Sequence, residues 1–150
     1  MAETPMAALN SHMKAISEKN LQDLRLGSEY PFVHINEFGT KDWYETSDDV
    51  LDFPIWNDPD FGGAEITHSI VISSTGDLNV YLLTVQLRTK EQEFGDRVQA
   101  IWAVARNGED WLVSCGNFLE SSRKKISTFV DLVQVNLCIS AIEGLLREIR

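Results

Sequence analysis

The chain has 150 residues, a formal net charge of −10 and 43% hydrophobic residues. This length suits one domain with a sizeable core. A strongly acidic chain repels phosphate backbones and anionic lipids, so we expect neither nucleic acid nor a membrane as a partner. No apolar run is long enough to span a bilayer, and residues 1–10 do not resemble a secretion signal. We therefore expect a cytoplasmic protein.

The two cysteines, Cys115 and Cys138, lie inside apolar periodic segments rather than at loop positions. This placement is typical of buried, reduced thiols. Nothing near Cys115 in sequence would activate it as a nucleophile. No Cys/His cluster has metal-ligand spacing, and an acidic loop at Asp58 and Asp60 lacks the final carboxylate of a calcium loop. We expect no metal and no cofactor.

The chain opens with two predicted helices. Thr4 can cap the first and Pro5 suits its first position. Apolar residues then recur three or four apart through Ile16. The second helix is short, Leu21–Leu26, and ends at Gly27.

The rest of the chain to Glu120 is predicted to be mostly strand. Phe32–Glu37 alternates, and Trp43–Glu45 is able to pair back on it. A loop follows at Ile55–Gly63, where proline, glycine and aspartate come in close order. Four long antiparallel strands are then expected: Ala64–Ser74, Leu78–Thr89, Arg97–Arg106 and Trp111–Glu120, the last pair joined through Asn107-Gly108. Helices followed by an antiparallel sheet predict an α+β fold.

Two central strands, around Tyr81–Val85 and Ile101–Ala105, are apolar on both faces. A sheet with one wet face would alternate with polar residues, so both faces need a cover. We expect the N-terminal helices on one face and a homodimer contact on the other. A C-terminal helix, Ile126–Ile149, has two apolar stripes and is expected to pack on its own sheet, a partner subunit or both. The predicted division is a domain at 1–122 and this helix at 123–150.

The segments "ETPMAALNSHMKAISEKNLQDLRLG", "PFVHINEFG" and "VQAIWAVARNGEDWLVSCGNF" resemble the first helix pair, first strand and closing hairpin of the nuclear transport factor 2-like superfamily. That superfamily has a cone-shaped α+β fold and also contains ketosteroid isomerases and polyketide cyclases. The likeness covers about Thr4–Glu120 and is strongest to a bacterial branch with "PFVHI" and "W-x-V" signatures and no known chemistry. The helix after Ser122 is not part of the usual pattern.

The resemblance also implies where a site would lie, inside the cone. Ketosteroid isomerases carry an aspartate base near the end of the first strand and a tyrosine on the first helix. The matching positions here are Asn36 and His12. Asparagine takes no proton at neutral pH, so the isomerase mechanism is not expected.

Other polar residues are candidates for lining the cone, although strand alternation prevents all of them from facing it. Their side chains either hydrogen-bond or, for histidine, titrate near neutrality. The ligand-binding candidates are His12, His34, Asn36, Trp56, His68, Gln99 and Asn117, with Trp56 expected at the pocket mouth. The alternative interpretation of the strand histidines is that they are merely polar positions of half-buried strands.

Three functional hypotheses follow. The first is a homodimeric protein that binds a small apolar molecule. The second is an enzyme that uses His34, His68 or His12 as an acid or base on such a molecule. The third is a structural interaction module that docks through its terminal helix.

Overall fold

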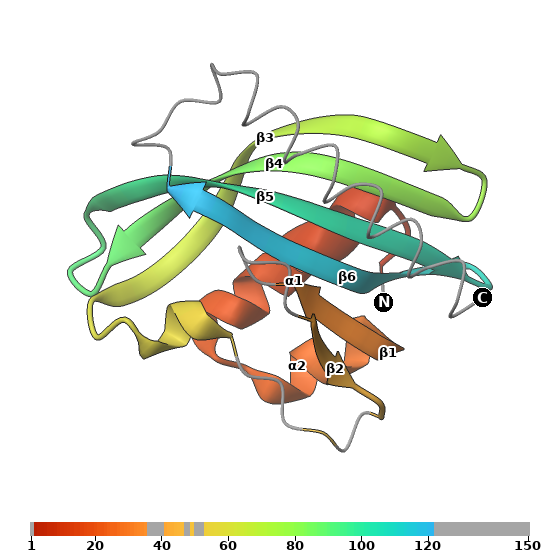
Figure 1. The fold of residues 1–150 in the computed structure, drawn as a ribbon, viewed down its shortest axis with the longest axis horizontal. Helices are drawn as coiled ribbons and strands as arrows, with labels where there is room; N and C mark the ends of the chain where they lie inside the picture. Colours follow the sequence, from red (N-terminus) through yellow and green to blue (C-terminus); the bar gives the residue numbers. More distant parts are fainter. Residues whose placement is uncertain (1, 36–40, 47–48, 50–52, 122–150) are drawn as a thin grey trace.

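The computed structural model describes residues 2–35, 41–46, 49 and 53–121. The predicted C-terminal helix and the division at residue 122 lie outside these residues and stay predictions. Two helices, one 3₁₀ turn and six strands make up the described part (Figure 1). No helix within it is long and apolar enough to cross a membrane.

The helices begin and end as their capping residues predict. Helix α1 spans Pro5–Glu18, and the Thr4 hydroxyl accepts a hydrogen bond from the Ala7 amide at 3.1 Å. Lys19 ends α1 in the left-handed conformation. Helix α2 spans Leu21–Leu26 and is capped by Asn20.

The strands form one curved sheet in the order β2-β1-β6-β5-β4-β3. Every pair is antiparallel except β1 with β6, which run parallel. The bounds are β1 Ser28–Ile35, β2 Lys41–Tyr44, β3 Phe61–Thr75, β4 Leu78–Thr89, β5 Phe94–Asn107 and β6 Asp110–Ser121. This mostly antiparallel α+β sheet confirms the predicted fold class.

The segment predicted as loop is more ordered than its composition indicates. Pro54–Asn57 forms a 3₁₀ turn, η1, because proline fixes a backbone angle compatible with helical geometry at its first position. Strand β3 starts at Phe61, inside the predicted loop, where it pairs with Thr89 at the end of β4.

Helix α1 lies across the concave face of the sheet (Figure 1). The Ser17 hydroxyl ties it to β3 by accepting from the Ala64 amide at 2.8 Å and donating to the Ala64 carbonyl at 3.0 Å. Apolar side chains of α1 and the concave face form the main core, with Trp102 of β5 fully buried within it.

Strand β5 is buried on both of its faces. Ile101, Ala103 and Ala105 alternate with the concave-face residues and are each 0% exposed. The homodimer contact predicted on this outer face, from the two-sided apolarity of Tyr81–Val85 and Ile101–Ala105, stays a prediction.

Candidate functional site

His12 is the polar residue that the fold buries most conspicuously. It lies on the core-facing side of α1, close in sequence to Leu9, Met13 and Ile16, which are also buried. Its side chain is 3% exposed, and neither ring nitrogen has a hydrogen-bond partner among the residues that the structure describes. Buried polar atoms are nearly always paired in folded proteins, so this imidazole requires an explanation.

Aromatic rings surround His12 on three sides. The ring of Trp102 lies 5.0 Å away between centroids, that of Phe32 6.0 Å and that of Phe53 6.2 Å. The three rings come from β5, β1 and the segment just before η1. None of them offers a hydrogen-bond acceptor, so His12 sits in an apolar aromatic shell.

This shell determines the charge state of His12. Burial, and to a lesser extent the nearby His34, together lower the pKa of His12 to about 3. The charged form is disfavoured because the apolar surroundings cannot solvate it. His12 is thus a neutral imidazole at physiological pH, with one N–H donor and one free acceptor nitrogen.

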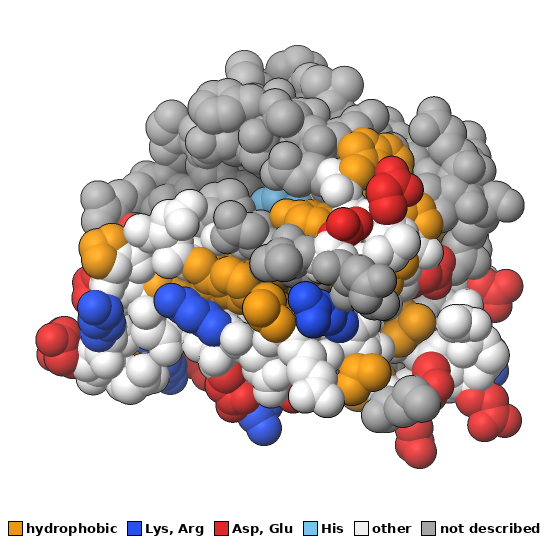
Figure 2. Space-filling model, turned by 90° about the horizontal axis from the view of Figure 1, so that it is seen from below, with side chains coloured by type: hydrophobic (Ala, Val, Ile, Leu, Met, Phe, Trp, Pro, Cys, Tyr) orange, Lys and Arg blue, Asp and Glu red, His pale blue; other side chains and the backbone are white. Residues whose placement is uncertain are grey.

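His34 of β1 faces the same interior. It shares its strand face with Phe32, is 3% exposed, and meets the Phe53 ring edge-on at 5.5 Å between centroids. Strand alternation thus puts two predicted site residues, His12 and His34, around the one ring of Phe53. Figure 2 views the molecule from below and shows histidine surface beside hydrophobic side chains.

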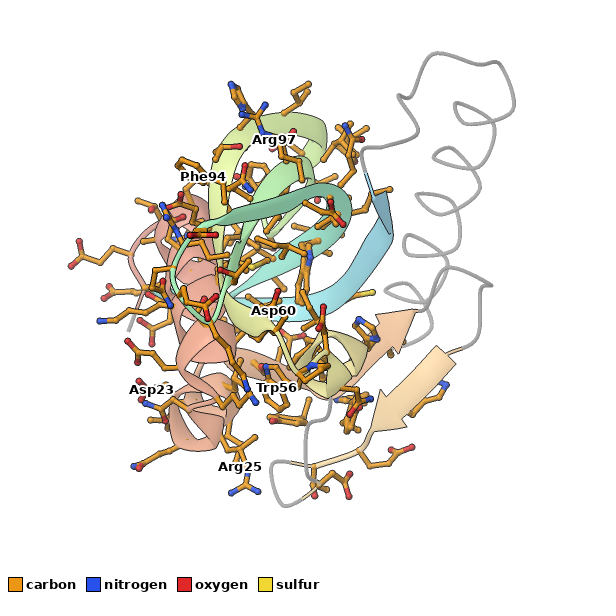
Figure 3. The ribbon with its side chains drawn as sticks, turned by 90° about the vertical axis from the view of Figure 1, so that its left-hand side faces the viewer. Asp23, Arg25, Trp56, Asp60, Phe94 and Arg97 are labelled. Carbon is orange, nitrogen blue, oxygen red and sulfur yellow. The ribbon has the colours of Figure 1, made fainter. Side chains whose placement is uncertain are left out.

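Trp56 holds the segment that carries Phe53 against α1. Its indole N–H donates to the Ile16 carbonyl at 2.9 Å, and its ring packs edge-on against Phe53 at 5.2 Å. Figure 3 shows Trp56 beside the lower end of α1. Trp56 therefore positions the aromatic shell, and its bond satisfies a carbonyl in the last turn of the helix.

Two predicted candidates lie on the other face of the sheet. Gln99 alternates with Ala100 and Trp102, which belong to the concave-face core, so it faces outward. Gln99 and His68 both pair with Thr84 of β4, from opposite sides of that strand. His68 is exposed, and its Nδ1 lies 3.2 Å from the Thr67 hydroxyl. Neither residue joins His12 and His34.

The remaining two candidates are not placed inside the cone by the described structure. Asn117 pairs with Ile101, an outer-face residue, in the register of β5 with β6. Asn36 lies outside the described residues.

Gly116 of β6 lies directly against the ring of Trp102. A Cβ atom added at Gly116 would lie 2.3 Å from the Trp102 ring, so only glycine lets β6 pass the indole at this distance. Sequence reasoning assigned Trp102 to the core but did not connect it to a site. The glycine inside an otherwise regular strand was the available signal.

Other chemistry is not supported among the described residues. No group of His, Cys, Asp or Glu in them could hold a metal ion. Burial raises the pKa of the Cys115 thiol to about 12, so this cysteine is inert as a nucleophile.

No protein-family model and no curated protein matches the chain in sequence. Solved structures do match it. An NTF2-like protein from Cytophaga hutchinsonii is 12% identical with a TM-score of 0.57, over 76% of this chain and 93% of that one. An NTF2-like protein of unknown function from Pseudomonas putida is 13% identical with a TM-score of 0.58, over 76% and 82%. A Novosphingobium aromaticivorans protein, provisionally described as an aromatic ring hydroxylase, is 11% identical with a TM-score of 0.55, over 76% and 84%.

The chain has the nuclear transport factor 2-like fold, as the sequence resemblance predicted. Likeness at this level of identity concerns the fold alone, and this fold hosts many functions. A function for this chain has to be argued from its own site.

Proposed function

We propose that this chain binds a small, electrically neutral and largely apolar molecule between α1, β1 and the concave face of the sheet. One observation carries the proposal: within the described part of the chain, the two ring nitrogens of His12 are buried in an aromatic shell without partners. Leaving a buried polar group unpaired costs about 1–3 kcal/mol. A ligand with a hydroxyl or carbonyl group would remove that cost by bonding to His12.

The surroundings favour a neutral ligand. Among the described residues, the buried polar side chains include no Asp, Glu, Lys or Arg. An ion bound in this interior would therefore lack a compensating charge. His12 does not supply one, because its pKa is lowered to about 3. Phe32, Phe53 and Trp102 instead offer faces and edges to a flat apolar body.

The same facts favour binding over acid–base catalysis by His12. An efficient general acid or base has a pKa near the working pH. A group with a pKa of about 3 is a weak base, and at neutral pH it lacks the imidazolium form that would act as an efficient general acid. The provisional hydroxylase description of one fold neighbour agrees with an aromatic ligand but adds no residue to the argument.

The test is a thermal-shift comparison of three similar rings: phenol, benzoate and benzylamine. We expect phenol to raise the melting temperature and the two ions to have little effect. A free phenol concentration of about 100 times the dissociation constant would add about 2.7 kcal/mol to the free energy of unfolding.

Two variants show whether His12 is responsible. His12→Leu should lose the phenol response, because leucine offers no hydrogen bond. His68→Leu is the matched control and should keep the response, because His68 is exposed on the other face. An equal phenol response in the His12→Leu protein would refute the proposal, and so would the absence of a phenol response in the unaltered chain.

A further inference from the structure

Strand β3 exposes a run of large aliphatic side chains. Ile70 is 63% exposed, Val71 52% and Ile72 36%. Consecutive residues of a strand point to opposite faces, so the three flank the strand on both sides. A partner that covered all of them would have to approach the edge of the sheet rather than either face.

Within the described residues, no strand lies beyond that edge. β3 is the last strand in the sheet order, and β4 is the strand that pairs with it in the described part of the chain. At its start, the carbonyls of Gly62 and Ala64 accept bonds from Gln92 and Ser17. The open stretch lies beyond this region. A long exposed apolar edge is the feature that pairs with another strand.

Charge indicates what the partner is. Residues 66–76 contain no Asp, Glu, Lys or Arg, in a chain whose formal net charge is −10. Two copies of so acidic a chain repel each other, and the repulsion is smallest where their charge-free segments meet. A basic partner would gain nothing by docking on an uncharged strand. The charge pattern therefore fits a second copy of the same chain.

The bulges of β3 define the length of the contact. Register shifts occur between Ile66 and His68 and between Val71 and Ser73, which leaves a regular segment at His68–Val71. Bulges interrupt pairing and limit run-on assembly. An antiparallel pair centred on this segment is self-complementary and closes as a dimer, because each copy uses its β3 edge only once.

We infer that the edge of β3 at His68–Val71 is an interface between two copies of this chain, which pair as antiparallel strands about a two-fold axis. The two-fold axis then lies between Ser69 and Ile70, so Ile70 faces Ser69 of the second copy and Val71 faces its His68. The inference is independent of ligand binding at His12.

The experiment is analytical ultracentrifugation of the full chain at micromolar concentrations, with Ile70→Lys, Val71→Lys and a control. The control is Leu26→Lys, because Leu26 is 70% exposed but lies on α2, away from β3. We expect the unaltered chain and the control to sediment at twice 17.0 kDa. The two β3 variants should weaken the dimer by about tenfold or more, because each buries two like charges near the axis. Raising NaCl from about 50 to about 300 mM should strengthen the unaltered dimer by screening its repulsion.

Hydrogen exchange of the unaltered chain provides a second measurement that needs no variant. Amides of His68–Val71 should become more protected as protein concentration rises, because strand pairing removes them from water. A monomeric unaltered chain would overturn the inference. A dimer that survives both β3 substitutions, or shows no concentration-dependent protection in β3, would place the interface elsewhere and overturn it equally.

Discussion

His12 combines a polar side chain with an apolar site, and this conflict is measurable in the ligand-free protein. Replacing it by leucine removes two buried nitrogens that have no partner among the described residues, and keeps a side chain of similar bulk. We expect His12→Leu to raise the free energy of unfolding by about 1–3 kcal/mol. Urea denaturation at neutral pH measures this change. A loss of stability would show that the imidazole stabilises the ligand-free protein, which would contradict the view that it lacks a hydrogen-bond partner there.

The same residue makes stability depend on pH. The pKa of His12 is about 3 in the folded state, against an ordinary value of 6.5, so the unfolded state binds the proton more tightly. The contribution of His12 to the free energy of unfolding is therefore fully present above pH 6.5 and is lost as the pH falls below this value. Between pH 7 and pH 5 the loss should be about 2 kcal/mol. His12→Leu should remove that part of the slope in urea titrations, whereas His68→Leu should retain it.

Substitution of Gly116 should destabilise the fold, because its backbone lies directly against the ring of Trp102. Alanine there would place a methyl carbon 2.3 Å from the indole ring, so the ring or strand β6 must move. We expect Gly116→Ala to cost about 1–3 kcal/mol of unfolding free energy, as in other overpacked cores. Gly76→Ala is the control, because a Cβ atom there meets nothing within 4 Å. Similar stability losses in both variants would contradict the close packing of Gly116 against Trp102.

At the scale of elements, the contact of η1 with α1 holds Phe53 in the aromatic shell around His12. Trp56→Phe keeps an aromatic ring beside Phe53 but deletes the donor to the Ile16 carbonyl. We expect a loss of about 1 kcal/mol in unfolding free energy. The matched variant Trp43→Phe, at a side chain that is 42% exposed, should change stability much less. Equal effects of the two substitutions would mean that the indole bond does not hold η1.

Local signals predicted most elements of this fold. Thr4 and Pro5 begin α1, Gly27 ends α2, and Gly108 takes the left-handed conformation in the β5–β6 turn. Errors occurred where pairing partners override composition. Phe61 belongs to a strand although it follows proline and aspartates, because β4 provides its partner.

The site was predictable only in part. Odd spacing from Trp102 would have placed Gln99 on the opposite face by alternation alone. His68 could not be placed this way, because the register shift after Ile66 changes which residues of β3 face inward. The approach of His12 to His34 and Phe53 joins three separate elements, so no local pattern reveals it.

At the scale of the whole molecule, the role of residues 123–150 stays a prediction. Their sequence has the two apolar stripes of a helix that packs on more than one element. Truncation after Ser122 should therefore lower solubility or stability, measured by soluble yield and thermal unfolding. The full-length chain prepared in parallel is the control. A truncated protein with unchanged solubility, stability and sedimentation would contradict the prediction that this segment packs on the domain or on a partner.

Binding at His12 is the central claim for the whole molecule, and nitrogen-15 NMR of the histidine rings during a phenol titration tests it most directly. His12→Leu assigns the His12 ring signals by their absence. We predict that added phenol shifts a ring nitrogen of His12 by forming a hydrogen bond, while the ring signals of exposed His68 stay unchanged. His12 signals that do not move, or that move no more than those of His68, would contradict the proposed binding site.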